Sequence, residues 1–259
     1  MIILISPAKT LDFETPVSSK LKSEPRFAGE SQRLVNHLKK KSARSLKKLM
    51  DISDDLAALN YERYQSWSQP ADSDHSKPAV FAFKGDVYLG LQAEKLNGKD
   101  LQFAQDHLRI LSGLHGILRP MDLILPYRLE MGTSLKVTPK LSNLYKFWGD
   151  SVTLELLKDL ESTGSKAIVN LASEEYFKVI KTKLVDHEII TPAFYDWKNG
   201  EYKMIGYFAK KARGTMAAFA IRNKITDPEQ LKLFNEENYS YNDRLSQGNK
   251  WIFTRENKE

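Results

Sequence analysis

The sequence predicts an α+β or mixed α/β protein that forms a single compact domain over residues 1–259. Short apolar runs typical of buried strands, such as 2–5 and 166–171, alternate with segments of helical periodicity. Interleaved strands and helices of this kind are typical of one packed core. No internal repeat or interdomain linker interrupts the chain, because the two polar stretches, 14–29 and 66–78, have the composition of surface loops.

The expected elements follow from the spacing of apolar residues. Strands are expected at 2–5, 79–83, 166–171 and 251–254. Helices are expected at 30–41, 144–160, 174–180 and 212–224, with another beginning near 226–229. A hairpin is expected between 187–198 and 201–210, because Asn199-Gly200 accepts the positive φ angles of a type I′ turn.

Composition narrows the class of protein. Hydrophobic residues make up 41% of the chain and charged residues 28%, which is typical of a globular protein. The chain has no cysteine, which excludes disulfides, thiolate metal sites and cysteine nucleophiles. No local metal-ligand spacing or nucleotide-binding glycine motif occurs, so neither a metal nor a cofactor is expected. The N-terminal apolar run ends at Ser6 and Pro7, and no run reaches the roughly 20 residues of a membrane helix, so we expect a cytoplasmic protein without membrane contact.

The segment 31–50 concentrates the positive charge of the chain. It contains seven basic residues and no acid, and the chain has a net charge of +6, so the remaining residues sum to −1. The seven are Arg33, Lys39, Lys40, Lys41, Arg44, Lys47 and Lys48. A local positive field of this kind favours a polyanion, although a solvated helix face is the ordinary alternative.

Two helices joined by a tight connection are expected within residues 42–67. The first is expected at 42–50, the connection at 51–53 and the second helix at 54–67, with Ser53 as its N-cap. The apolar residues expected to hold the pair together are Leu46, Leu49, Leu56, Leu59 and Tyr64. Such a helix-hairpin-helix binds DNA phosphates without sequence preference, but the usual glycine is absent here, and an ordinary helical hairpin remains an equal alternative.

Three further segments carry candidate site residues. A second acid-free segment, 202–225, holds the basic cluster Lys210, Lys211, Arg213, Arg222 and Lys224, which indicates either a phosphate site or solvated charge. The segment 106–132 embeds charged residues in apolar sequence, which indicates either a pocket wall containing Arg128 and Glu130 or a buried arginine–carboxylate network. Lys84 and Asp86 flank Gly85 at the expected end of a strand, where sites often form and simple turns occur equally well.

Several stretches together resemble one family. They are Ser6-Pro7-Ala8-Lys9-Thr10-Leu11-Asp12, Phe83-Lys84-Gly85-Asp86-Val87-Tyr88, Leu111-Ser112-Gly113-Leu114 with Leu118-Arg119-Pro120, Pro126-Tyr127-Arg128-Leu129-Glu130-Met131-Gly132, Phe147-Trp148-Gly149-Asp150, Asn170-Leu171-Ala172-Ser173 with Glu175-Tyr176-Phe177, and Lys210-Lys211-Ala212-Arg213-Gly214. In this order they resemble the YaaA family of bacterial peroxide stress resistance proteins.

The resemblance implies a DNA-binding protein with an unusual α/β fold, a basic cleft and a helix-hairpin-helix. It also implies roles in survival of hydrogen peroxide, in limiting free iron, and in recombination and repair. By this similarity Arg44, Lys47, Lys48 and Ser53 lie in the helix-hairpin-helix. The candidates for the cleft are Lys9, Lys84, Arg128, Lys210, Lys211 and Arg213. Similar proteins often have tyrosine where this chain has His115, which argues against an essential base at that position.

Two functions remain open from the sequence. The first is a cytoplasmic DNA-binding protein that recognises the backbone and shape of duplex, bubble or junction DNA with low sequence specificity. The second is an enzyme acting on a nucleotide, base or small phosphorylated compound, with Asp86, Glu130 and Lys84 as candidate catalytic groups. Its pocket would be lined by Lys9, Lys84, Asp86, Arg128, Glu130 and Lys210.

Overall fold

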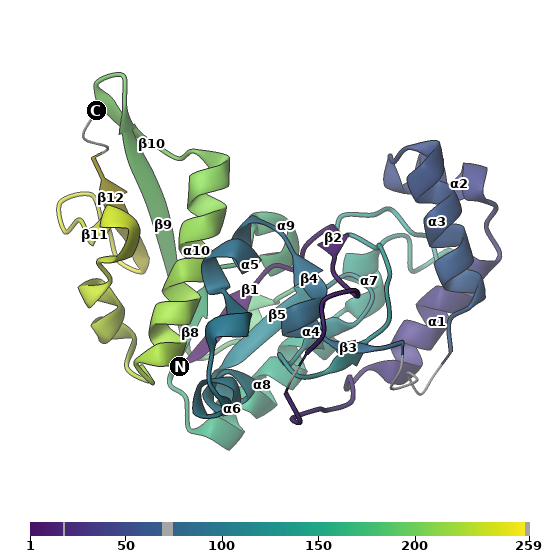
Figure 1. Cartoon of the computed structure of the whole chain (residues 1–259), viewed down its shortest axis with the longest axis horizontal. Helices are drawn as coiled ribbons and strands as arrows, with labels where there is room; N and C mark the ends of the chain where they lie inside the picture. The colour runs from purple at the N-terminus through teal and green to yellow at the C-terminus, as the bar shows by residue number, and fades with distance from the viewer. Residues whose placement is uncertain (18, 69–74, 257–259) are drawn as a thin grey trace.

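A mixed β-sheet forms the centre of the molecule (Figure 1). In the computed structural model, which describes residues 1–17, 19–68 and 75–256, its strands lie in the order β11-β12-β9-β8-β1-β5-β6, with β10 paired to β9. The bounds are β1 (Ile2–Ile5), β5 (Leu108–Ser112), β6 (Gly116–Leu118), β8 (Ala167–Asn170), β9 (Glu188–Lys198), β10 (Glu201–Lys203), β11 (Ser240–Tyr241) and β12 (Lys250–Arg255). Strands β5, β1, β8, β9 and β12 run parallel, and β6, β10 and β11 are antiparallel to their partners. The predicted mixed α/β class is confirmed.

Strand β1 is an interior strand of this sheet. Its four residues are buried, and it pairs with β5 on one side and β8 on the other, so that Ile3 lies opposite both Leu108 and Val169. A strand covered on both faces has no polar side to present, which explains its continuous apolar sequence.

Helices cover the sheet and extend beyond it (Figure 1). α1 (Ala28–Lys39), α2 (Ala43–Met50) and α3 (Asp54–Gln65) form a group at one end of the molecule, and α10 (Gly206–Arg222) lies at the opposite end beside β9. The other helices are α4 (Ala79–Ala82), α5 (Asp86–Leu91), α6 (Gly98–His107), α7 (Leu144–Trp148), α8 (Ser151–Thr163) and α9 (Glu174–Phe177). The 3₁₀ turns are η1 (Ala93–Lys95), η2 (Thr182–Leu184), η3 (Pro228–Leu233) and η4 (Glu236–Asn238).

Helices α5 and α10 approach each other closely because both have glycine at the contact. A Cβ atom added at Gly214 would lie 1.7 Å from the carbonyl oxygen of Val87, and one added at Gly90 would lie 2.0 Å from that of Lys211. Both distances are far shorter than any van der Waals contact. The contact therefore requires glycine on both helices, and it places the middle of α10 against α5.

Four predicted elements differ from the structure. The strand expected at 79–83 is wrong: the backbone forms α4, and only β4 (Phe83–Lys84) is extended, paired with β2 (Thr10–Leu11). The helix expected at 144–160 is two helices, because Gly149 adopts a φ of 51° between α7 and α8. Asn199 and Gly200 have the predicted positive φ angles, but the second strand of that hairpin ends at Lys203 and α10 begins three residues later. The helix expected near 226–229 is η3, a 3₁₀ turn that Asp227 caps.

The loops expected at 14–29 and 66–78 are only partly described. Residue 18 and residues 69–74 lie outside the described part of the chain. At the end of the second loop, β3 (Lys77–Pro78) pairs with β7 (Leu123–Ile124).

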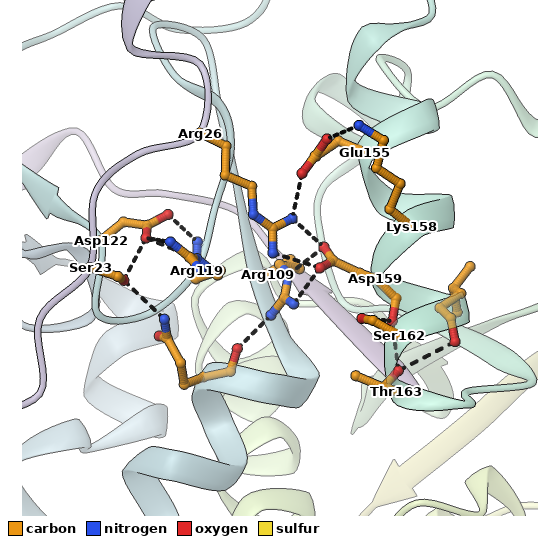
Figure 2. Close-up of polar contacts among 12 residues, drawn as sticks. Ser23, Arg26, Arg109, Arg119, Asp122, Glu155, Lys158, Asp159, Ser162 and Thr163 are labelled. Atoms are coloured by element: carbon orange, nitrogen blue, oxygen red, sulfur yellow. Dashed lines mark hydrogen bonds and ion pairs between the residues drawn. The ribbon is translucent and has the colours of Figure 1, made fainter.

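A buried network of arginines and carboxylates connects α8, β5 and the N-terminal loop (Figure 2). Asp159 accepts two hydrogen bonds from Arg109, at 2.6 and 2.7 Å, and two from Arg26, at 2.9 and 2.7 Å. Burial raises the pKa of Asp159, but the hydrogen bonds from the two guanidinium groups outweigh it and hold this pKa below its ordinary value. A second pair joins Arg119 to Asp122 at 2.9 Å. The segment 106–132 therefore contributes Arg109, Arg119 and Asp122 to a buried arginine–carboxylate network, which is one of the two roles predicted for it.

Candidate nucleic-acid interface

The helices α2 and α3 begin where predicted, within one residue, although α3 ends at Gln65 rather than at residue 67. The side chain of Ser42 accepts a hydrogen bond from the backbone N–H of Ser45 and caps α2, and Ser53 does the same for α3 through Leu56 N–H. Asp51 adopts the left-handed conformation, with φ 51°, and so ends α2. The two-helix arrangement is confirmed, and its function as a DNA-binding helix-hairpin-helix stays a prediction.

The side chains that hold this pair together differ in part from those expected. Leu46 and Tyr64 are buried as predicted, but Leu56 is 37% and Leu59 is 40% exposed. Met50, Ile52 and Ala57 occupy the buried positions instead. Because the hydroxyl of Tyr64 donates a hydrogen bond to the backbone carbonyl of Arg128, α3 is also anchored to the segment that contains the predicted pocket wall.

The candidate cations of the hairpin lie together but are not equivalent. Arg44, Lys47 and Lys48 line a shallow hollow of about 480 Å³ with Asp51 and Asp54. Lys47 Nζ lies 2.7 Å from Asp54 Oδ2, so its charge is offset. Arg44 and Lys48 are exposed and form no ion pair within the described part of the chain, so they are the cations of the hairpin that are free to meet a phosphate.

The start of α3 presents acids as well as a capped backbone. Asp54 and Asp55 occupy its first turn, where negative charge stabilises the helix. The Leu56 N–H already donates to Ser53. A phosphate approaching this helix end would meet two carboxylates, so contacts from the Arg44 and Lys48 side chains are more favourable than contacts from the α3 backbone.

The second basic cluster is largely neutralised by residues distant in sequence. Lys210 Nζ lies 3.7 Å from Asp86, Lys211 Nζ 2.7 Å from Glu237, and Arg222 2.6 Å from Glu236. Lys224 forms an ion pair with Asp100. Although the segment 202–225 contains no acid, most cations of its basic cluster are therefore paired with acids from other segments.

Arg213 is the exception in this cluster. Its guanidinium forms no ion pair, and its Nε is buried without a hydrogen-bond partner in the described part of the chain. Burial lowers the pKa of Arg213 below its ordinary value. An arginine that is desolvated without an acidic partner is a good candidate for contact with an anion.

Lys9, Glu130 and Arg128 form one chain of ion pairs. Lys9 Nζ lies 2.7 Å from Glu130 Oε2, and Arg128 Nη2 donates to Glu130 Oε1 at 3.0 Å. Glu130 therefore bridges a cation from the loop after β1 and a cation from the segment after β7. The Lys9 side chain is 63% exposed, so it can exchange this carboxylate for a phosphate with little change in burial.

Lys84 belongs to a second cluster, around Asp12, which the sequence interpretation did not select. Lys84 Nζ lies 3.5 Å from Asp12 Oδ2, and the buried Lys77 donates to the backbone carbonyls of Asp12 and Thr15 at 2.8 Å. Hydrogen bonds from the backbone N–H and hydroxyl of Thr15 are the main reason that the pKa of Asp12 is lowered. The spacing Asp12-x-x-Thr15, typical of an Asx turn, is the sequence signal that could have identified it.

The carboxyl ends of the neighbouring strands β1 and β8 lie at the point of the sheet where the strand order reverses. From β1 the chain continues to β5 on one side, and from β8 it continues to β9 on the other, so their following loops diverge at this point. The loops meet through Ser6 Oγ, which accepts a hydrogen bond from Ser173 N–H at 2.9 Å. Tyr88, from α5, donates to the carbonyl of Ser6 at 3.2 Å. In the sequence Ser173 and Tyr88 stand out only as parts of motifs, because their partners lie far away along the chain.

Of the six groups of the predicted pocket, only Lys84 is among the described residues that line the cavity of about 760 Å³ beside α5. Glu130 forms ion pairs with Lys9 and Arg128. Asp86 forms one with Lys210. The arrangement therefore connects loops rather than concentrating ionisable groups around one substrate.

His115 lies in the core. It is 1% exposed, its Nδ1 lies 3.0 Å from Ser31 Oγ, and burial lowers its pKa to about 3. A neutral imidazole enclosed in this way is a packing residue at physiological pH.

The described residues contain no group of three or more histidine, aspartate or glutamate side chains that could hold a metal ion. They also contain no helix that is long and apolar enough to cross a membrane.

The fold and these surfaces define a cysteine-free, mixed α/β protein with a basic helical hairpin at one end of its sheet. The model of the family described as "Peroxide stress protein YaaA" matches residues 1–245. A "UPF0246 protein" of Hahella chejuensis is 50% identical over 256 residues, covering 99% of this chain and 100% of the relative. One of Cupriavidus metallidurans is 52% identical over 258 residues, covering 98% of both chains. The chain belongs to the YaaA family of peroxide stress proteins, which confirms the resemblance.

Proposed function

We propose that this protein acts in the cytoplasm as a DNA-binding protein of the peroxide stress response. It contacts backbone phosphates and recognises the shape of duplex or branched DNA, with little readout of base sequence. The observation that carries this proposal is the charge of α1, α2 and the turn between them. Of the seven cations in segment 31–50, only Lys47 forms an ion pair with a described residue.

The cations contribute to the proposed surface in a definite order. Arg44 and Lys48 come first, because they are exposed and unpaired in the described structure. Lys9 and Lys84 come next, because their side chains are 63% and 62% exposed although each lies near a carboxylate. Lys210 and Lys211 rank lower, since DNA must first displace Asp86 and Glu237 from them. Figure 1 places α2 and α10 on opposite sides of β2, which follows Lys9, so a duplex spanning these elements would cross the loop after β1.

Salt-titrated binding to duplex, bubble and four-way-junction DNA tests this proposal. Neutralisation of about 4 to 6 phosphates predicts a log–log slope of about −4 to −5 for duplex DNA. The double variant Arg44→Glu/Lys48→Glu is expected to bind at least tenfold more weakly and to reduce the slope by about 2.

The matched control is Lys95→Glu/Lys99→Glu, which makes the same change in net charge at exposed positions on η1 and α6. It should retain most of the affinity, because α6 lies away from α2 (Figure 1). Equal losses in both double variants would indicate a general charge effect and contradict a localised surface. Wild-type binding that stays flat between low and moderate salt would refute the proposed mode of recognition.

Roles in DNA repair and in limiting free iron form part of the same proposal. A protein that binds damaged or branched DNA would support repair directly. Its effect on iron would then be indirect, which requires no metal ligand in this chain.

The enzyme alternative receives less support from the geometry. Lys9 and Arg128 share Glu130, and Lys210 pairs with Asp86, so each candidate base is paired with a cation in this structure. Lys84, the third candidate catalytic group, lies 3.5 Å from Asp12, outside that chain. We therefore favour DNA binding over catalysis.

A further inference from the structure

A second large cavity lies at the opposite end of α3 from the hairpin. Its volume is about 790 Å³, within the usual range for small-molecule sites. Part of its wall is apolar and includes two aromatic rings and three prolines: Phe13, Trp67, Pro16, Pro78 and Pro126. Aromatic and proline faces of this kind suit a flat, uncharged ring.

The rim of this cavity is positively charged. Arg63 and Lys22 line it and form no ion pair in the described part of the chain, while Glu14 is the only acid among the described wall residues. Burial lowers the pKa of Arg63, and within the described part of the chain no ion pair with an acid offsets the desolvation of this guanidinium. Lys77 also lines the cavity, but its amine is occupied by the carbonyls of Asp12 and Thr15.

The cavity thus combines apolar faces with two cations that form no ion pair in the described part of the chain.

We propose that this cavity binds an unpaired nucleotide of DNA, with its base against Phe13 and the prolines and its phosphate against Arg63 and Lys22. This inference rests on the proposed DNA-binding function and adds a preference for DNA with an unpaired base. Base stacking is tolerant of sequence, and an arginine fork matches phosphate geometry. α3 connects this cavity to the cationic hairpin over 12 residues, about 18 Å, so one DNA molecule can reach both.

The test compares two DNA molecules that differ at one position. One is a fully paired duplex, and the other carries a single extrahelical 2-aminopurine, whose fluorescence reports stacking. Wild type should bind the bulged DNA about tenfold more tightly and change the fluorescence of the base. Arg63→Met should abolish this preference while leaving the affinity for paired duplex within about twofold, and Arg63→Lys should restore part of it.

The control is Arg244→Met, which removes an exposed arginine from the connection between β11 and β12 and should keep the full preference. Thermal unfolding of each variant shows whether it is folded. Phe13→Leu, which shortens the stacking surface without adding charge, provides a second test should Arg63→Met fail to fold.

The possible outcomes distinguish failure of the nucleotide site from failure of the proposed DNA-binding function. Binding of both DNA molecules with equal affinity would overturn the nucleotide site and leave DNA binding intact. Loss of all DNA binding by wild type would overturn both. If the protein binds no bulged DNA but free dAMP quenches its tryptophan fluorescence in a way that depends on Arg63, the cavity binds a free nucleotide. This result would overturn the proposal that the nucleotide belongs to DNA.

Discussion

The buried imidazole of His115 makes a quantitative prediction about acid stability. In the unfolded chain a histidine has a pKa of about 6.5, while burial lowers the pKa of His115 to about 3 in the folded protein. Between pH 6.5 and pH 3, His115 therefore binds a proton in the unfolded state but not in the folded state. The contribution of His115 to stability is present above pH 6.5 and is lost as the pH falls toward 3.

The size of the effect follows from the interval between these two pKa values. Each pH unit within it corresponds to about 1.4 kcal/mol, so the contribution of His115 should fall by about 2.7 kcal/mol between pH 7.5 and pH 4.5. His115→Gln removes the titrating group and keeps an amide that can reach Ser31. The variant should be less stable at pH 7.5, because its packing changes, but its stability should fall less steeply on acidification.

Urea unfolding of wild type and His115→Gln at pH 7.5, 6.5, 5.5 and 4.5 measures this difference. Common acid-sensitive groups cancel when the two pH dependences are subtracted. Parallel curves for wild type and His115→Gln would show that the folded protein accommodates a charged His115 and would refute the reasoning.

Three other predictions concern the scaffold and can be checked by the midpoints of urea unfolding. Gly214→Ala should lower the free energy of unfolding by about 3 kcal/mol or more, because the new Cβ would lie 1.7 Å from the Val87 carbonyl oxygen. The control is Gly29→Ala in α1, where the new Cβ would meet no neighbouring atom, so this variant should be neutral or more stable by up to about 1 kcal/mol. Similar values for both glycines would contradict the contact between α5 and α10. Asp159→Asn should lower it by about 3 to 5 kcal/mol by leaving the buried Arg109 without its carboxylate and the partly buried Arg26 with only Glu155, and a loss below 1 kcal/mol would show that the network is dispensable. Ser53→Ala should lower it by about 1 kcal/mol through loss of the α3 cap, and an unchanged midpoint would mean that water replaces the cap.

Sequence reasoning predicted best where structure depends on neighbouring residues. The first residues of α2 and α3 follow from the caps Ser42 and Ser53, and the turn at Asn199-Gly200 follows from backbone preference. It predicted less well where a single backbone conformation decides the outcome. Gly149 ends α7 with a positive φ, a choice that the apolar periodicity of 144–160 does not reveal.

Candidate site residues were found by type and position, but their partners were not. Lys210 and Lys211 were selected because no acid lies near them in sequence, and in space Asp86 and Glu237 offset their charge. Arg128 and Glu130 were selected together and do form a pair, although the third member, Lys9, comes from a loop far away in the chain.

The sequence alone determined the class of fold, the positions of the capped helices and the location of an acid-free basic segment, since these depend on local spacing and composition. Only the tertiary structure decided which of those charges remain unpaired. An ion pair is a contact between side chains that the fold brings together, so Arg44 and Lys48 stay free while Lys47 does not. The same physical reason explains why the cavity beside Arg63 has no local sequence signature: its wall comes from segments that meet only when the chain folds.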